Sequence, residues 1–187
     1  MDALTILIIR HAEKPGEDWP GSGLTSEGGS DDKSLVIRGW QRAGAWAALF
    51  GTGLNSQSYP RPAVVYAVQP GDGANAEDGP SKRPAETVSP LCARLGQAAK
   101  TNFALGAERD LMKEVLALTG TVLIAWEHKA IVSAILPHIP TDAKLPSKWP
   151  GTRFDVVFRF DRPAGAEQFA FRQLFPQLLS GDSTTPI

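Results

Sequence analysis

The chain has 187 residues, which is enough for one domain with a substantial hydrophobic core. Its 19 lysines and arginines nearly balance its 20 aspartates and glutamates, which argues against broad binding to nucleic acid or to an acidic membrane surface. The single cysteine, Cys92, excludes an internal disulfide framework and a zinc site built from cysteines. The apolar run at residues 3–9 is too short for a membrane span or a signal peptide, so we expect a cytoplasmic protein.

Three aliphatic runs without polar alternation predict strands that are covered on both faces. They lie at residues 4–9, 63–68 and 121–126, and amphipathic helical patterns lie at about 35–50 and 107–119. Alternating strands and helices predict an α/β fold with a mostly parallel central sheet and helices on both faces. On the first helix, Arg38 and Arg42 are expected to lie on the solvated face.

Pro90 interrupts the helical pattern that follows the second strand. Because proline has no amide hydrogen, we expect a short turn here and then a helix with Ser89 as its N-cap and Gly96 beyond its end. A further short helix is expected between His128 and Leu136, before the next proline.

Two more strands are predicted near the C-terminus, at residues 153–160 and 168–172, where they would form a hairpin at one edge of the sheet. The polar segment 180–187 is expected to be a loose tail of a single domain that spans residues 1–187. Segments 15–33 and 70–80 follow the first two strands, at the edge where α/β sheets bind ligands. They are either walls of a pocket or mobile surface loops.

The tetrapeptide Arg10-His11-Ala12-Glu13 ends the first predicted strand. Three further groups follow in order along the chain: Leu35, Gly39, Arg42 and Ala43; Ser81, Arg83, Glu86 and Thr87; and His128. In this combination the chain resembles the histidine phosphatase superfamily, which includes the phosphoglycerate mutases. The resemblance covers about residues 4–136. It implies a phosphoglycerate mutase-like three-layer αβα sandwich and a single histidine phosphatase-like domain.

The resemblance also implies a phosphomonoesterase that acts through a phosphohistidine intermediate on a small or protein-borne phosphate. His11 is then the nucleophile, Arg10 and Arg83 bind the transferred phosphoryl group, and His128 both contacts that group and stabilises the developing charge. These residue types suit the chemistry, because arginines bind phosphate oxygens in pairs. A neutral histidine can attack phosphorus with one ring nitrogen while the other donates to a backbone carbonyl. No metal or other cofactor is expected, and the partner is a phosphorylated substrate.

Other functions stay open at this point. Phosphotransfer of the mutase type is disfavoured by Glu17, which stands where a mutase usually carries an asparagine that contacts phosphate. A phosphate-binding or regulatory module with slow turnover is a second alternative. His11, Glu13 and His128 could instead form a metal site with two histidines and one carboxylate, although two converging arginines would repel the metal.

The sequence does not identify the acid that would protonate the leaving group. Glu127 and Lys129 flank His128, where many members of the superfamily carry a glycine or an aspartate. Three carboxylates are candidates: Glu13, Glu127 and Glu108. Glu13 stands at a position that usually organises the pocket in relatives. Glu127 would point away from His128 if the strand continued through both residues. Glu108 suits the positive end of a helix.

Overall fold

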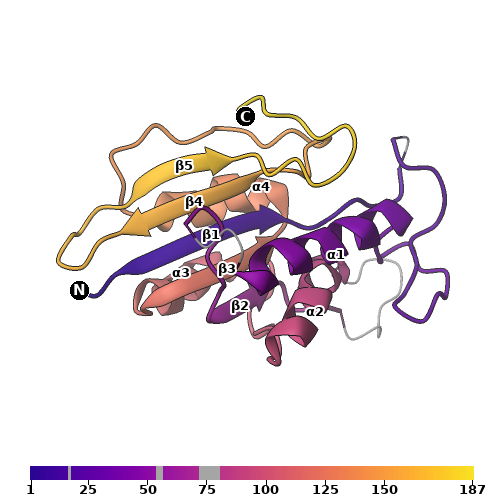
Figure 1. Ribbon diagram of the computed structural model, residues 1–187, viewed down its shortest axis with the longest axis horizontal. Helices are drawn as coiled ribbons and strands as arrows, with labels where there is room; N and C mark the ends of the chain where they lie inside the picture. The colour runs from indigo at the N-terminus through magenta and orange to yellow at the C-terminus, as the bar shows by residue number, and fades with distance from the viewer. Residues whose placement is uncertain (17, 54–56, 72–80) are drawn as a thin grey trace.

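The computed structural model describes residues 1–16, 18–53, 57–71 and 81–187 of the chain (Figure 1). Within these residues, five strands form one sheet in the order β2-β3-β1-β4-β5. The strands, in chain order, are β1 (Leu4–Arg10), β2 (Val64–Ala67), β3 (Gly120–Trp126), β4 (Val157–Arg162) and β5 (Ala170–Leu174).

The α/β class is confirmed, but the sheet is mixed. Strand β3 runs parallel to both β1 and β2, whereas β4 pairs antiparallel with β1 and β5 pairs antiparallel with β4. Two of the four strand pairings are parallel and two are antiparallel, which corrects the expectation of a mostly parallel sheet. The reason is the predicted hairpin of β4 and β5, which joins the sheet directly beside the central strand β1 rather than through a helical crossover.

Helices cover both faces of this sheet (Figure 1). Strand β1 lies at its centre, and its side chains alternate between two cores: Ile6 and Ile8 pack with residues of α3, and Leu7 and Ile9 pack with residues of α1 and α2. The helices in chain order are α1 (Ile37–Thr52), α2 (Arg83–Leu95), α3 (Glu108–Leu116) and α4 (His128–Ala130).

The short helix expected after His128 is present and changes its winding twice. After α4 the chain continues as a π-helical segment, η1 (Ile131–Ile135), and then as a 3₁₀ turn, η2 (Leu136–His138), in which Pro137 stands. Buried Ile131 and Ile135 attach this segment to the core. Among the described residues, no helix is both long and apolar enough to cross a membrane.

Helix α2 is continuous through Pro90, so the expected break and the Ser89 cap are wrong. A proline inside a helix leaves one backbone carbonyl without its usual amide donor, here that of Glu86. The Ser89 hydroxyl donates to the Glu86 carbonyl oxygen at 3.0 Å and replaces that bond. Gly96 ends the helix in the left-handed conformation, with φ of 69°, as expected.

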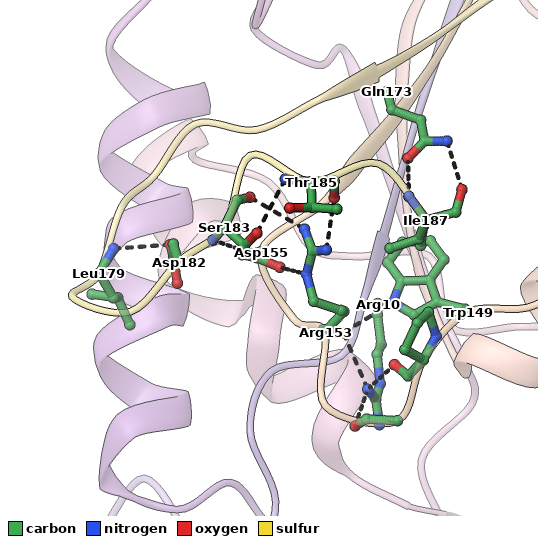
Figure 2. A network of polar contacts seen from close by, with 12 residues as sticks. Arg10, Trp149, Arg153, Asp155, Gln173, Leu179, Asp182, Ser183, Thr185 and Ile187 are labelled. Atoms are coloured by element: carbon green, nitrogen blue, oxygen red, sulfur yellow. Dashed lines mark hydrogen bonds and ion pairs between the residues drawn. The ribbon is translucent and has the colours of Figure 1, made fainter.

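The C-terminal segment is bound to the domain, which differs from the loose tail that its composition predicts (Figure 2). The Ser183 amide donates to Asp155 at 2.6 Å, and the Arg153 guanidinium donates to the Thr185 carbonyl at 2.7 Å. At the end of the chain, the Ile187 amide donates to the side chain of Gln173 at 2.9 Å. The polar residues that hold the tail lie on distant segments, so local composition does not reveal them.

Gly39 lets helix α1 pack directly against the backbone that follows β1. A Cβ atom on Gly39 would lie 2.5 Å from the Glu13 carbonyl oxygen, which is closer than real Cβ contacts. The same carbonyl accepts a hydrogen bond from the Val36 amide at 3.2 Å. Gly39 therefore sets the distance between the helix and the chain that leaves β1.

We predict that Gly39→Ala destabilises the fold by about 1–3 kcal/mol, because the added methyl group forces α1 away from residue 13. Gly44→Ala in the same helix is the matched control. Its new methyl group would meet nothing within 4 Å, so the higher helix propensity of alanine should stabilise the protein by about 0.5–1 kcal/mol. Urea unfolding measures both free energies, and equal effects at the two glycines would contradict the packing argument.

Candidate active site

A pocket of about 130 Å³ lies where β1 and β3 end. The parallel pairing of these strands sets Arg10 opposite Trp126, and the His11 amide donates to the Trp126 carbonyl at 3.0 Å. The residues that follow the two strands therefore meet at one edge of the sheet. The pocket is lined by Arg10, His11, Lys14, Val68, Ser81, Arg83, Pro84, Leu105, Glu127 and His128.

His11 is buried in this pocket and is held in one tautomer. Its Nδ1 lies 2.8 Å from the Ala12 carbonyl oxygen, and because a carbonyl can only accept, Nδ1 carries the hydrogen. The other ring nitrogen, Nε2, keeps its lone pair. Burial, reinforced by the positive charge of Arg10, lowers the pKa of His11 to about 3. The imidazole is thus neutral at physiological pH and can act as a nucleophile.

Arg10 is buried and anchored along one edge of its guanidinium (Figure 2). Nη1 donates to the backbone carbonyls of Gly151 at 2.6 Å and Arg153 at 3.1 Å, and the group lies 3.9 Å from the centre of the Phe154 ring. Burial lowers the pKa of Arg10 to about 10, so it stays a cation at neutral pH. Its Nε is buried without a hydrogen-bond partner among the described residues.

Arg83 begins α2 and reaches the loop before α1. Its Nε donates to the Ser34 carbonyl at 3.3 Å, and its Nη2 donates to the Asp32 carbonyl. Burial lowers the pKa of Arg83, and the nearby carboxylates, Glu86 first among them, oppose this effect.

Thr87 joins α2 to the chain around His11. The Thr87 hydroxyl donates to the Arg83 carbonyl at 2.7 Å and accepts from the Ala12 amide at 2.8 Å. One side chain thus fixes the first turn of α2 against the residue next to His11.

Glu127 and His128 form a carboxylate–imidazole pair. The Glu127 Oε1 atom lies 2.6 Å from Nδ1 of His128, and its Oε2 accepts from the Ala130 amide at 2.8 Å. Burial raises the pKa of Glu127, but the hydrogen bonds from His128 and from the backbone outweigh it and lower the pKa to about 2. The expectation that Glu127 points away is wrong, because β3 ends at Trp126 and Glu127 caps α4 instead.

Glu13 does not reach this pocket. It is buried and accepts from Arg42 at 2.8 Å, while Arg42 also donates to Asp182 at 2.7 Å. Glu13 lines a separate pocket on the side of Arg42 and the C-terminal segment. Arg42 itself is buried, which corrects the expectation that it lies on a solvated face.

The alternative metal site therefore does not form. Because Glu13 pairs with Arg42, it does not meet His11 and His128. Across the part of the chain that the structure describes, no group of three or more histidines, cysteines and acidic residues is placed to hold a metal ion.

Glu108 is a buried structural carboxylate. It begins α3, as its sequence position suggests, and accepts from the indole Nε1 of Trp126 at 3.0 Å and from the Gly106 amide at 3.0 Å. It lies outside the lining of the pocket. Its role is to tie the turn around residue 106 to the end of β3, and Leu105 of this turn does line the pocket.

Four pocket residues are not among those that the sequence analysis names for the site: Lys14, Val68, Pro84 and Leu105. Burial and the nearby charges of Arg83 and Arg10 lower the pKa of Lys14. Its position three residues after His11 was a usable signal, because it keeps the side chain near the end of β1. Leu105 carries no local signal. Residues 72–80, most of the segment expected to be either a pocket wall or a mobile surface loop, and Glu17 lie outside the described residues.

Comparisons with known proteins show a fold likeness. No family model matches the chain, and no curated protein matches it. Among solved structures, the fold is similar to one titled mycobacterial hydrolase 2, with a TM-score of 0.52 and 13% sequence identity. The match covers 92% of this chain and 90% of that one. At this identity the likeness shows a shared α/β fold alone, and membership of the histidine phosphatase superfamily stays a prediction.

We predict that the His11 ring stays neutral above about pH 5, whereas a histidine in an unfolded chain titrates near 6.5. Burial and the nearby positive charge of Arg10 exclude the extra proton. Histidine ring chemical shifts measured by NMR against pH test this, and the signal missing from His11→Asn identifies the resonance. A His11 signal that titrates like that of a free histidine would contradict the electrostatic argument.

We also predict that Arg42→Met destabilises the protein by about 3–5 kcal/mol, because Glu13 and Asp182 lose their buried partner. Arg61→Met, at an exposed position, is the control and should change stability by less than about 0.5 kcal/mol. Chemical denaturation measures both. A loss at Arg42 no larger than that at Arg61 would show that this network contributes little.

Proposed function

We propose that this protein is a metal-independent phosphomonoesterase that acts through a phosphohistidine on His11. The observation that carries the proposal is a buried neutral imidazole in a pocket that also holds two arginines and a lysine. A phosphate monoester is an anion of suitable size for such a pocket, and its transfer depends mainly on positioning and charge neutralisation. The fold likeness to a hydrolase agrees with this class at the level of architecture.

Arg10 and Arg83 would bind the phosphoryl oxygens. Both guanidinium groups are fixed by backbone carbonyls, so neither has to be ordered when an anion binds. The unpartnered Nε of Arg10 is a donor that a phosphoryl oxygen would satisfy. Charge-assisted hydrogen bonds of this kind are roughly twice as strong as those between neutral groups.

In the first step, the lone pair on Nε2 of His11 attacks phosphorus. The bond from phosphorus to the ester oxygen breaks, and the leaving group departs with the electron pair. The ring then carries a positive charge, which the hydrogen bond from Nδ1 to the Ala12 carbonyl stabilises. In the second step, a water oxygen attacks phosphorus, the phosphorus–nitrogen bond breaks, and its electron pair returns to Nε2. The water proton goes to solvent, and inorganic phosphate leaves.

His128 would support the transferred group. Because the Glu127 carboxylate lies against Nδ1, the Nε2 side of His128 is left for the substrate. In its protonated form, His128 can donate from Nε2 to a phosphoryl oxygen while the Glu127 carboxylate balances its charge. Glu127 is therefore a positioning residue in this scheme.

A phosphate-binding module with slow turnover is the second candidate function. One observation favours it: Glu13 and Glu108 are engaged outside the pocket, and the bonds that Glu127 accepts keep it ionised. A protein that only binds phosphate needs no acid for a leaving group. The same experiment separates the two functions.

We predict that the purified protein hydrolyses p-nitrophenyl phosphate and that EDTA leaves the rate unchanged. His11→Ala should lower kcat/KM by about 10³-fold or more, because the nucleophile is lost. Arg83→Ala should lower it by about 10²- to 10³-fold, because one donor to the phosphoryl group is lost. The release of p-nitrophenol measures each rate. His138→Ala and Arg109→Ala, both at exposed positions, are matched controls.

Other outcomes assign other functions. Full activity in His11→Ala would contradict the phosphohistidine mechanism, and loss of activity in EDTA would indicate a metal-dependent reaction. A folded wild type that releases no p-nitrophenol, but unfolds at a higher temperature in phosphate, would be the binding module.

A further inference from the structure

The described residues that line the pocket include one carboxylate, Glu127, and it is ionised. Two contacts hold the charged form in place: Nδ1 of His128 lies 2.6 Å from Oε1, and the Ala130 amide donates to Oε2 at 2.8 Å. Protonation would require Glu127 to give up both interactions. Glu127 is therefore arranged to accept hydrogen bonds, not to donate a proton.

The other two candidate acids are bound elsewhere. Glu13 accepts from Arg42 with both carboxylate oxygens, at 2.9 and 3.1 Å from the same Nε. Glu108 accepts from Trp126 and from the backbone, and its side chain is buried. Neither residue lines the pocket, so neither can reach a leaving oxygen there.

Of the other described lining residues, Ser81 carries a weakly acidic hydroxyl, and His128 contacts the transferred phosphoryl group in the proposed mechanism. Val68, Pro84 and Leu105 are apolar, and Leu105 is 47% exposed. Arg10 and Arg83 are fixed cations that suit phosphoryl oxygens. Lys14 is exposed, and within the described residues no hydrogen bond holds its ammonium group in one orientation. The wall therefore offers apolar contact to the leaving group.

We propose that the substrate is a phosphate carried on an acidic hydroxyl, with aryl phosphates as the class that fits, because the described lining of the pocket offers apolar side chains and its one carboxylate, Glu127, is held by His128 and Ala130. This inference rests on the proposed phosphohistidine mechanism. The phosphorus–oxygen bond breaks and the leaving oxygen keeps the electron pair as a phenolate. A phenolate is stable enough to depart without a proton, whereas the alkoxide of an alkyl ester is not. The ring of the leaving group packs against Val68, Pro84 and Leu105.

The test compares three esters that all carry an aromatic ring: p-nitrophenyl, phenyl and benzyl phosphate. Benzyl phosphate is the matched control, since it offers the same ring but leaves as an alkoxide. General acid catalysis contributes about 10²- to 10⁴-fold. Without it, kcat/KM for benzyl phosphate should be lower than kcat/KM for p-nitrophenyl phosphate by about 10²-fold or more. Phenyl phosphate should lie between them, because phenol has a pKa of about 10, like tyrosine.

Three results are distinguishable. A steep decline from p-nitrophenyl to phenyl to benzyl phosphate supports the inference. Rates within about 10-fold for all three overturn it while leaving the phosphatase function intact, because some group then donates a proton. In that case a selective loss of benzyl phosphate hydrolysis in Glu127→Gln, Lys14→Met or His128→Asn identifies the donor. No release from any ester means that the proposed function itself fails, whatever the leaving group.

Discussion

The parallel pairing of β1 with β3 is the constraint on which the site depends. Its register sets Arg10 opposite Trp126, so His11 and the Glu127–His128 pair leave the sheet side by side. A shift of one residue would turn every side chain of β1 to the other face. Both faces of β1 are buried under helices. Burial therefore explains the central place of the strand, whereas its register depends on how individual side chains pack. The functional side chains are thus placed by the same contacts that form the two cores.

Polar contacts from the segment before β4 and from the C-terminal segment hold the site residues in place. The Arg153 carbonyl accepts from both Arg10 and the Trp149 indole, at 3.1 and 2.9 Å. The Arg153 side chain donates to Asp155, which accepts from the backbone of the C-terminal segment (Figure 2). On the other side, Asp182 of the same segment accepts hydrogen bonds from Arg42, which also pairs with Glu13. The C-terminal segment therefore braces both Arg10 and the chain that carries His11.

The sequence predicted the central elements well because continuous aliphatic runs and helical periodicity are local signals. It also placed Arg10, His11, Arg83 and His128 at a common edge, because each stands at the end of a strand or the start of a helix, and the structure has all four in one pocket. It failed where the deciding partner is distant in the chain. From the local sequence, Arg42 looks like a charged surface residue. Its burial depends on Asp182, which is 140 positions away in the chain.

Pro90 and Glu127 differ from expectation for another reason, because in each case a side chain makes a hydrogen bond with the backbone. The Ser89 hydroxyl supplies the hydrogen bond that Pro90 cannot make, so α2 does not break. Strand alternation stops at Trp126, and Glu127 turns back to cap α4. In both cases the local rule holds for the residue itself, but one hydrogen bond between a side chain and the backbone changes the structure that results.

The charges of the pocket bear on how a buried histidine could act as the proposed nucleophile. Burial first, and then the charges of Arg10 and Arg83, lower the pKa of His11 and so keep its lone pair available. The same two cations also disfavour a positive charge on the ring. A bound phosphate dianion offsets both arginines. In the proposed mechanism, this dianion balances the two neighbouring cations, so a positive charge that develops on the His11 ring would be stabilised by the bound substrate. Binding of the anion would then offset the electrostatic cost of forming the imidazolium.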